Sequence, residues 1–533
     1  MSNVNESALA PFKHRTFLVM WLAALVSNIG TWMHSVGAGW LMTELSPSPL
    51  VVALVQTATT LPIFVFALPA GALADIFNRR TLLLITNIVM LLAAVVFSLL
   101  VYNKSVNSTT LLLFTFLLGS GAAFMAPAWQ AVIPRMVPEE SLSQAVVLGG
   151  ISINLSRAIG PALAGVLITF YGVAMPFFAN AASFVVIIAA LFWWKNVMPK
   201  PSDNLPPEKV FSAMKAGVRY ARHSKPLKAT MWHALGFMFF ANAYWALLPI
   251  ISKQTLSGNA SFFGILMGAV GIGAVVGALF VPKLKTILNA NQFVVVGTLG
   301  TSLVTGYFAV VSSQVTAVLS SLFFGLSWIM VLASVNVSAQ QALPEWVRAR
   351  GLAVFMMVFF GSMSLGAAFW GWLAGETSIS SAMLTAAVGG TVFILLSFRA
   401  ELQQGKDMNL HPSHHWSMPI TRHGVEHNQG PVIIEIRYEV MPEDRNAFLH
   451  AVYKLKIARQ RYGAHNWGVY EDVEQEGKFV EHFMETSWAE HLRHHERVTQ
   501  SDKPLEEAVL AFHTGAPRPA VTHLLAAYPV KEP

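Results

Sequence analysis

The chain has 533 residues, of which 54% are hydrophobic and only 12% are charged. Soluble globular proteins carry roughly 25% charged residues, so the composition argues against a soluble enzyme. Residues 1–400 hold 21 Lys and Arg against 9 Asp and Glu, a net charge of +12, whereas residues 401–533 hold 14 against 19, a net charge of −5. No cysteine is present, which excludes disulfides, thiolate metal sites and cysteine nucleophiles.

Twelve apolar runs predict twelve transmembrane helices, because a hydrocarbon core about 30 Å thick needs about 20 apolar residues per helix. They lie near 17–43, 50–75, 81–102, 110–134, 143–170, 173–194, 229–252, 261–284, 292–312, 314–341, 350–374 and 379–398. The first run follows a polar start that ends in Lys13, His14 and Arg15. It is too long for a signal-peptide core, so we expect an uncleaved first span.

The basic residues between these runs predict the orientation of the chain. The N-terminal segment and the loops after the even-numbered spans hold 17 Lys and Arg, whereas the opposite loops hold only Lys104 and Lys253. We expect the protein to lie in the inner membrane. The positive-inside rule then predicts that both termini are cytoplasmic. Because the excess charge lies in short loops, it does not indicate a nucleic-acid partner.

The loop at 196–228 contains a predicted amphipathic helix. Its apolar stripe is Phe211, Met214, Val218 and Ala221, and Lys215, Arg219 and Arg222 lie off that stripe. Two interpretations stand: a helix that lies on anionic membrane lipid, or a solvated linker helix.

An internal repeat appears when the chain is shifted by 206 residues. Residues 71–73 then fall on 277–279, Gly119 on Gly325 and Gly165 on Gly371. The repeat predicts an all-α membrane protein with two six-helix halves, 1–195 and 229–400, related by an axis along the membrane normal.

The turn after the second span reads Gly71-Ala-Leu-Ala-Asp75-Ile-Phe-Asn78-Arg79-Arg80. It resembles the loop signature of the major facilitator superfamily, with two departures: Ile76 replaces the family's arginine and Asn78 replaces its glycine. Asn tolerates left-handed backbone, so we expect the turn to survive. As a carboxylate at a helix end, Asp75 is expected to accept hydrogen bonds from backbone amides or to pair with Arg79, in a contact that must break during transport. The alternative is a plain cytoplasmic charge cluster.

Residues 127–142 and 154–165 look like the branch of this superfamily called transmembrane secretion effectors, which includes the enterobactin exporter. The pair Gly160-Pro161 is similar to the fifth-span signature of the superfamily's antiporters. These resemblances imply export from the cytoplasm and proton antiport.

Arg157 is the one Lys or Arg placed deep within a predicted span. Asn154, Pro161 and Gly165 share its helix face, and the proline predicts a bend. Charge inside a span suggests function, so Arg157 is a candidate contact for an anionic cargo. A purely structural role remains the other interpretation.

In the resembled fold, spans 1, 4, 7 and 10 line a central cavity. The candidates on those spans are Asn28, Trp32, His34, Trp129, Gln130, His233, Asn242, Tyr244, Trp245, Trp328 and Asn336. Aromatic walls with a few amides suit a bulky, partly apolar cargo, although each residue could instead pack between helices. No Asp or Glu lies in the middle of a span, so His34 and His233 are the titratable candidates for coupling.

Residues 401–430 read as a solvated linker with scattered histidines, and 431–533 as a soluble domain. Strands are predicted at 432–440, 466–473, 478–487 and 520–528, and helices at 442–462, 488–498 and 505–512. This βαββαβ order resembles ferredoxin-like domains that pair into dimeric α+β barrels, which implies a possible homodimer.

Three histidines in this domain, His491, His494 and His495, have the spacing of one helix face. We expect them on a solvated basic helix beside Arg493 and Arg497, and we expect neither a metal nor a cofactor.

The favoured function is export of a small molecule, such as a siderophore, a drug or another metabolite, by alternating access. The alternatives are a nutrient-uptake permease and a membrane-tethered, monooxygenase-like enzyme that acts through its C-terminal domain. The sequence has no phosphate-binding loop for ATP.

Overall fold

The structure is a computed structural model of the chain. It describes residues 9–194, 210–397, 400–402, 404, 409–413, 415–416, 425–515 and 518–527. Two compact units are present. The helical unit comprises Met1–Met198, Ala229–Ala339 and Ala353–Leu402, and the second unit comprises Pro199–Lys228, Gln340–Leu352 and Gln403–Pro533.

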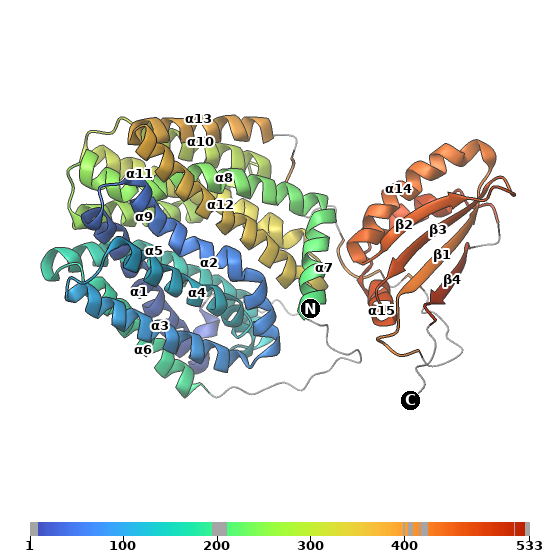
Figure 1. Cartoon of the computed structure of the whole chain (residues 1–533), viewed down its shortest axis with the longest axis horizontal. Coiled ribbons are helices and arrows are strands. Elements are labelled where there is room, and N and C mark those ends of the chain that lie inside the picture. Colours follow the sequence, from blue (N-terminus) through green and yellow to red (C-terminus); the bar gives the residue numbers. More distant parts are fainter. Residues whose placement is uncertain are drawn as a thin grey trace. The chain divides into compact units, whose positions relative to one another are not determined.

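The first half of the helical unit has six long helices, which agree with the predicted spans. They are α1 (Arg15–Leu45), α2 (Pro49–Ile76), α3 (Arg79–Tyr102), α4 (Ser108–Gln130), α5 (Leu142–Tyr171) and α6 (Met175–Trp193). Helix α1 packs against α5 and α6, and α2 packs against α4 (Figure 1).

The second half repeats this pattern. Its helices are α8 (Lys225–Ile250), α9 (Ala260–Leu284), α10 (Ala290–Phe308), α11 (Gln314–Gln341), α12 (Arg348–Glu376) and α13 (Ile379–Leu396). Over the described residues, 11 helices are long and apolar enough to cross a membrane. Helix α10 is the long helix outside that set, because Asn291, Gln292 and four hydroxyl residues from Thr298 to Thr305 dilute its apolar residues, but it packs along α13.

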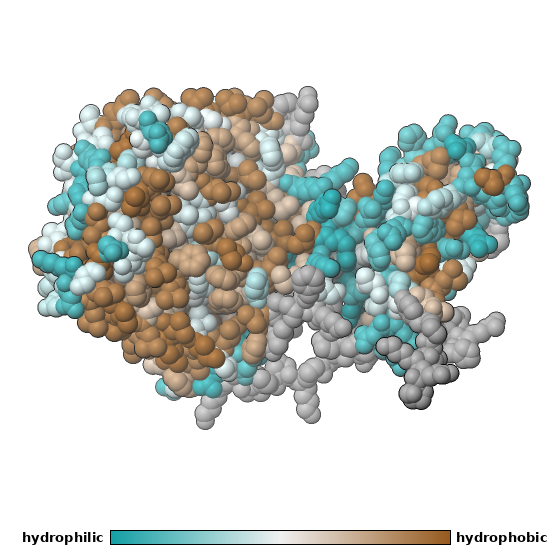
Figure 2. All heavy atoms as spheres, viewed as in Figure 1, coloured by the Kyte–Doolittle hydropathy of each residue, from teal (hydrophilic) through white to brown (hydrophobic). Residues whose placement is uncertain are grey.

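The face of the helical unit that Figure 2 shows is largely hydrophobic. Among the described residues of this unit, many leucine, valine and phenylalanine side chains are exposed, including Leu92, Leu303 and Phe170. Many buried hydroxyls donate to the carbonyl four residues earlier in their own helix, as Ser98 does to Ala94 and Thr305 to Thr301. These hydroxyls are therefore satisfied within their own helices, as a segment in lipid requires.

The second unit contains a four-stranded antiparallel sheet in the order β2-β3-β1-β4. The strands are β1 (Val432–Glu439), β2 (His465–Glu471), β3 (Lys478–Glu485) and β4 (Ala520–Leu525). The helices are α14 (Arg445–Tyr462), α15 (Trp488–Arg497) and α16 (Lys503–Leu510), so the predicted βαββαβ order is confirmed. One sheet face is buried, with Ile434, Phe448 and Phe483 in its core.

Two segments from the first 400 residues belong to the same unit. Helix α7 (Val210–His223) packs against α14, and the Tyr220 hydroxyl donates to the carbonyl of Ala342 at 3.1 Å. Trp346 contacts the rings of Tyr220 and Tyr462. The amphipathic helix is therefore present, and Ala216, Tyr220 and Ala221 on it are buried against protein.

Candidate functional site

The two halves of the helical unit meet along α5 and α9. A Cβ added at Gly264 would lie 2.5 Å from the carbonyl oxygen of Pro161, and one at Gly271 would lie 2.8 Å from that of Arg157. Gly165 packs equally closely against the backbone of Ser261. Small residues allow this backbone approach, as they do between membrane helices in general.

A second contact between the halves runs along α2 and α12. The Thr57 hydroxyl donates to the carbonyl of Ser364 at 3.1 Å, and Gly371 lies against Ala53. At the same end of the unit, Lys253 donates to the carbonyl of Thr43 at 2.7 Å.

These contacts between the halves all lie in one end of the unit, along residues 43–64 and 157–169 of the first half. Toward the opposite end of α2 and α5, a Cβ added at Gly71, Gly149 or Gly150 would meet nothing within 4 Å. The described halves are therefore packed together at the end that carries the α1–α2 turn.

Arg157 lies on α5 beside this contact. Its guanidinium carbon is 5.3 Å from the ring centre of Trp32, and its Nε and Nη1 atoms are buried without a hydrogen-bond partner among the described residues. Gly160 permits this approach, since a Cβ there would lie 2.5 Å from the Cβ of Trp32. The structure thus brings Arg157 and Trp32 together with Gly160-Pro161.

Trp245 and Trp328 form a second aromatic group between α8 and α11. Their ring centres are 5.5 Å apart, and Phe237 lies 5.1 Å from Trp328. Both indole nitrogens are buried without a partner among the described residues. These donors could meet an acceptor on a bound molecule.

Several candidates instead make their contacts inside their own half, and His34 among them has ring contacts but no hydrogen-bond partner among the described residues. His34 packs between Phe97 and Phe177. His233 bonds the carbonyl of Ala400 at 2.7 Å. The other such contacts are Asn242 to the carbonyl of Met363, and Tyr244 to the Ser321 hydroxyl and the Phe324 ring.

The remaining cavity candidates make local contacts. Trp129 packs against the core of the first half, and Gln130 is exposed at the end of α4. Asn28 is half-buried, and the Asn154 and Asn336 amides each donate to the carbonyl four residues earlier.

The basic pair after α2 holds helix ends within the first half. Arg79 donates to the carbonyl of Ala131, and Arg80 donates to those of Leu191 and Phe192. Asn78 has φ −59°, so the expected left-handed turn is wrong, and its side chain instead caps α3 by accepting from Arg80 and Thr81 amides. The Asp75 side chain lies outside the described residues.

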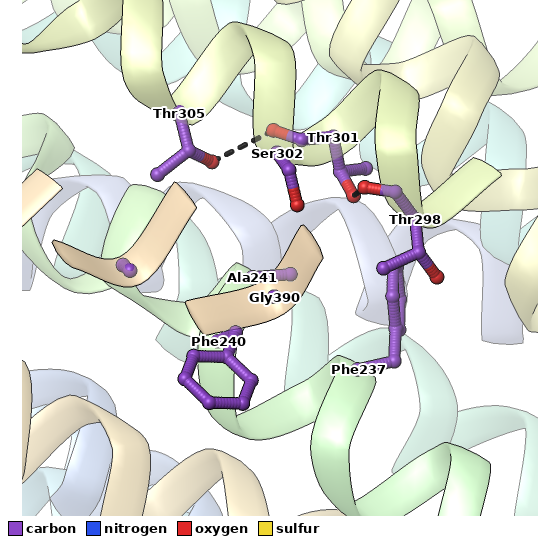
Figure 3. Close-up of a pocket in the computed structure, with 9 residues that line it drawn as sticks. Phe237, Phe240, Ala241, Thr298, Thr301, Ser302, Thr305 and Gly390 are labelled. Atoms are coloured by element: carbon purple, nitrogen blue, oxygen red, sulfur yellow. Dashed lines mark hydrogen bonds between the residues drawn. The ribbon is translucent and has the colours of Figure 1, made fainter. Parts of the chain in front are cut away.

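A small cavity lies within the second half, where the hydroxyls of α10 face α8 and α13 (Figure 3). It is lined by Phe237, Phe240, Ala241, Thr298, Thr301, Ser302, Thr305, Ala386 and Gly390. It has room for about one water molecule, so it is too small for a cargo.

The expectation of a solvated histidine face on α15 is wrong. His491 and His494 are 2% and 1% exposed, and both bond the buried carboxylate of Glu485. Burial lowers the pKa of His495 to about 3 and that of His523 on β4 to about 4. The imidazoles of His495 and His523 are therefore neutral near pH 7.

Two repeated six-helix halves, packed at one end beside a cationic and aromatic pair, define a membrane carrier and not an enzyme. The chain matches the model of the transmembrane secretion effector family over residues 6–530, and it belongs to that family.

Three comparisons illustrate the relationship. The chain is 26% identical to the staphyloferrin A transporter of Staphylococcus aureus over 270 residues, 50% of this chain and 66% of that protein. It is 25% identical to the enterobactin exporter EntS of Salmonella typhi over 401 residues, 74% of this chain and 93% of that protein. A crystal structure of a POT family transporter has the same fold, with a TM-score of 0.60 at 14% identity, over 72% of this chain and 95% of that one.

Proposed function

We propose that this carrier exports a small molecule from the cytoplasm across the inner membrane by alternating access. The observation that supports it is that the contacts between the halves, as far as the described residues show, lie at one end, along α5–α9 and α2–α12. In this mechanism the bundles 1–195 and 229–400 rock about a site between them.

The orientation follows from charge. The loops at the end opposite to the α1–α2 turn carry Arg79, Arg80, Arg135, Arg348 and other basic residues. By the positive-inside rule that end is cytoplasmic, so both termini are cytoplasmic and the described state faces the cytoplasm.

The cargo that fits the described chemistry is anionic or partly aromatic, and a siderophore is the leading class. The buried guanidinium of Arg157 beside Trp32 would bind a carboxylate or catecholate group, and two relatives are named for siderophores. Export should fall in Arg157→Ala and recover partly in Arg157→Lys, as seen by comparing metabolites in the medium. Full export in both variants would exclude direct cargo contact.

A pair of cysteines tests the rocking mechanism. The hydroxyls of Thr169 and Ser261 lie 2.6 Å apart across the two halves. Because the chain has no cysteine, Thr169→Cys with Ser261→Cys introduces the only thiols. A disulfide between them should stop export until a reductant is added, whereas each single variant should transport. Unchanged export by the cross-linked carrier would contradict alternating access at this contact.

Proton antiport is the coupling we propose, on the strength of the Gly160-Pro161 resemblance. Inside-out vesicles should accumulate cargo when a pH gradient is imposed, and right-side-out vesicles should not. Uptake that ignores the gradient would refute the coupling, and the reverse vesicle preference would indicate a nutrient permease.

Two surfaces of the second unit have a chemistry that would suit further binding partners. The sheet face opposite the helices carries half-exposed Ile433, Val480 and Met484, which would suit a second copy of the domain. Lys215 and Arg222 on α7 are exposed and would suit anionic lipid. The mass of the carrier in lipid discs, with Met484→Glu as the disrupting variant, tests the homodimer.

A further inference from the structure

Three histidines from two elements of the second unit converge on one point. His491 and His495 lie one turn apart on α15, and His523 comes from β4. Their nitrogen atoms lie within 4.8 Å of one another, and the ring of His491 is 4.7 Å from each of the other two. The fold therefore brings together three imidazoles that neither α15 nor β4 supplies alone.

A buried carboxylate fixes the central imidazole. Nδ1 of His491 lies 2.8 Å from Glu485, which extends from β3 and whose side chain is 1% exposed. With its Nδ1 proton donated to that carboxylate, His491 keeps the lone pair on Nε2. This is the orientation in which metal-bound histidines are usually held by an outer carboxylate.

The nitrogens that remain are buried and unpaired. Nε2 of His491 and Nδ1 of His495 have no hydrogen-bond partner in the described part of the chain. Burying unsatisfied polar atoms costs free energy, and simple packing of the three rings leaves that cost in place. A cation at the point where they converge would remove it.

The geometry points to a metal site formed by His491, His495 and His523, with Glu485 as the outer carboxylate, for a first-row divalent ion of which Zn²⁺ is the expected occupant. Three imidazole nitrogens suit Zn²⁺ and its neighbours and do not suit Ca²⁺ or Mg²⁺, which prefer oxygen. Three protein ligands would leave a fourth position for water or another ligand. This site does not depend on the cargo or the direction of transport.

The test is a cobalt titration of the full chain, purified in detergent with a tag that contains no histidine and stripped with a chelator. We expect one Co²⁺ per chain, with the visible absorption bands of a tetrahedral site, and displacement by one Zn²⁺. Absence of a saturable site in the wild-type chain would overturn the proposal.

Variants then locate the site. His495→Ala and His523→Ala should each weaken binding more than about 100-fold, and Glu485→Gln by roughly 10–100-fold, the usual effect of losing an outer-sphere partner. His450→Ala, an exposed histidine on α14, is the matched control and should bind as the wild type. Equal affinity in all four variants would contradict the assignment. Zn²⁺ should also raise the melting temperature of the wild type but not that of His523→Ala. Because each protein is compared with and without Zn²⁺, a small loss of stability in the variant does not affect this result.

Discussion

The helical unit and the C-terminal domain bury polar groups in opposite ways. In the helical unit, buried hydroxyls such as that of Ser98 bond their own helix, and the contact between the halves consists of close glycine packing with a few hydrogen bonds from Thr57, Thr169 and Lys253. In the domain, Arg459 is 5% exposed and lies between the buried carboxylates of Glu481 and Glu506. A contact without ionic partners can part at little electrostatic cost, whereas a buried charge network requires one arrangement. The difference suggests one region built to move and one built to stay fixed.

The sharpest test of this contrast removes the central cation of the network. Arg459→Met should destabilise the domain by about 3–5 kcal/mol, because two buried carboxylates lose their partner. Arg437→Met is the control, since the Arg437 side chain is 63% exposed and its pair with Glu435 contributes at most about 1 kcal/mol. Hydrogen exchange of the α14 amides in the full chain measures the loss of stability in each variant. Equal protection in the two variants would show that the buried charge network does not hold the domain in one arrangement.

On the helical side, the comparable change adds one methyl group. Gly264→Ala should destabilise the closed contact by roughly 1–3 kcal/mol, because the new Cβ would press on the Pro161 carbonyl. Export should fall about 10-fold at similar expression. Gly268→Ala is the control on the same helix, where the nearest atom would be 3.5 Å away. If both variants export equally, close packing is not required.

Acid should unfold the domain before the helical unit. Burial alone would raise the pKa of Glu506, but Arg459 and hydrogen bonds from His415 and Trp416 lower it to about 2. A carboxylate whose pKa is lowered in the folded state stabilises the fold at pH values above its pKa in the unfolded chain, which is near 4.5. This contribution is lost as the pH falls toward 2. We expect a loss on the order of 2 kcal/mol. Pepsin cleavage within 431–533 should rise over that range in the wild type and depend less on pH in Glu506→Gln.

The smallest effect concerns a cap in the helical unit. The Asn78 side chain accepts hydrogen bonds from the amides of Arg80 and Thr81 at the start of α3. Asn78→Ala should cost about 1 kcal/mol and Asn78→Asp much less, since Asp caps as well as Asn. Hydrogen exchange of the amides in the first turn of α3 measures the difference between the two variants. Identical exchange rates would show that the cap is dispensable.

The helices were predictable because a lipid environment imposes long apolar runs, which a single sequence displays. Even α10 was predicted, although its hydroxyls weaken the signal, because the run at 292–312 is still apolar enough and long enough to indicate a span. Asn78 shows the limit: the same residue serves a left-handed turn or a helix cap, and only the backbone of the turn distinguishes them.

The histidine cluster was missed for a different reason. Helical spacing related His491 to His494 and His495, but it could not reveal Glu485 on β3 or His523 on β4, which only the folded sheet brings near. One signal was present. Along β3 the residues Phe479, Glu481, Phe483 and Glu485 alternate on one face, so two acidic residues share a side with two buried phenylalanines. Acidic residues on an apolar strand face need buried cationic or imidazole partners.

Helix α7 and residues 340–352 pack into the C-terminal domain, so its folding unit is discontinuous in sequence. During synthesis, Tyr220 and Trp346 leave the ribosome well before helices α14 and α15, whose side chains pack against them. The domain therefore cannot complete its core until the final strand β4 has been made. A gene truncated at residue 402 would leave those two aromatic side chains uncovered, and we expect such a product to aggregate or to be degraded.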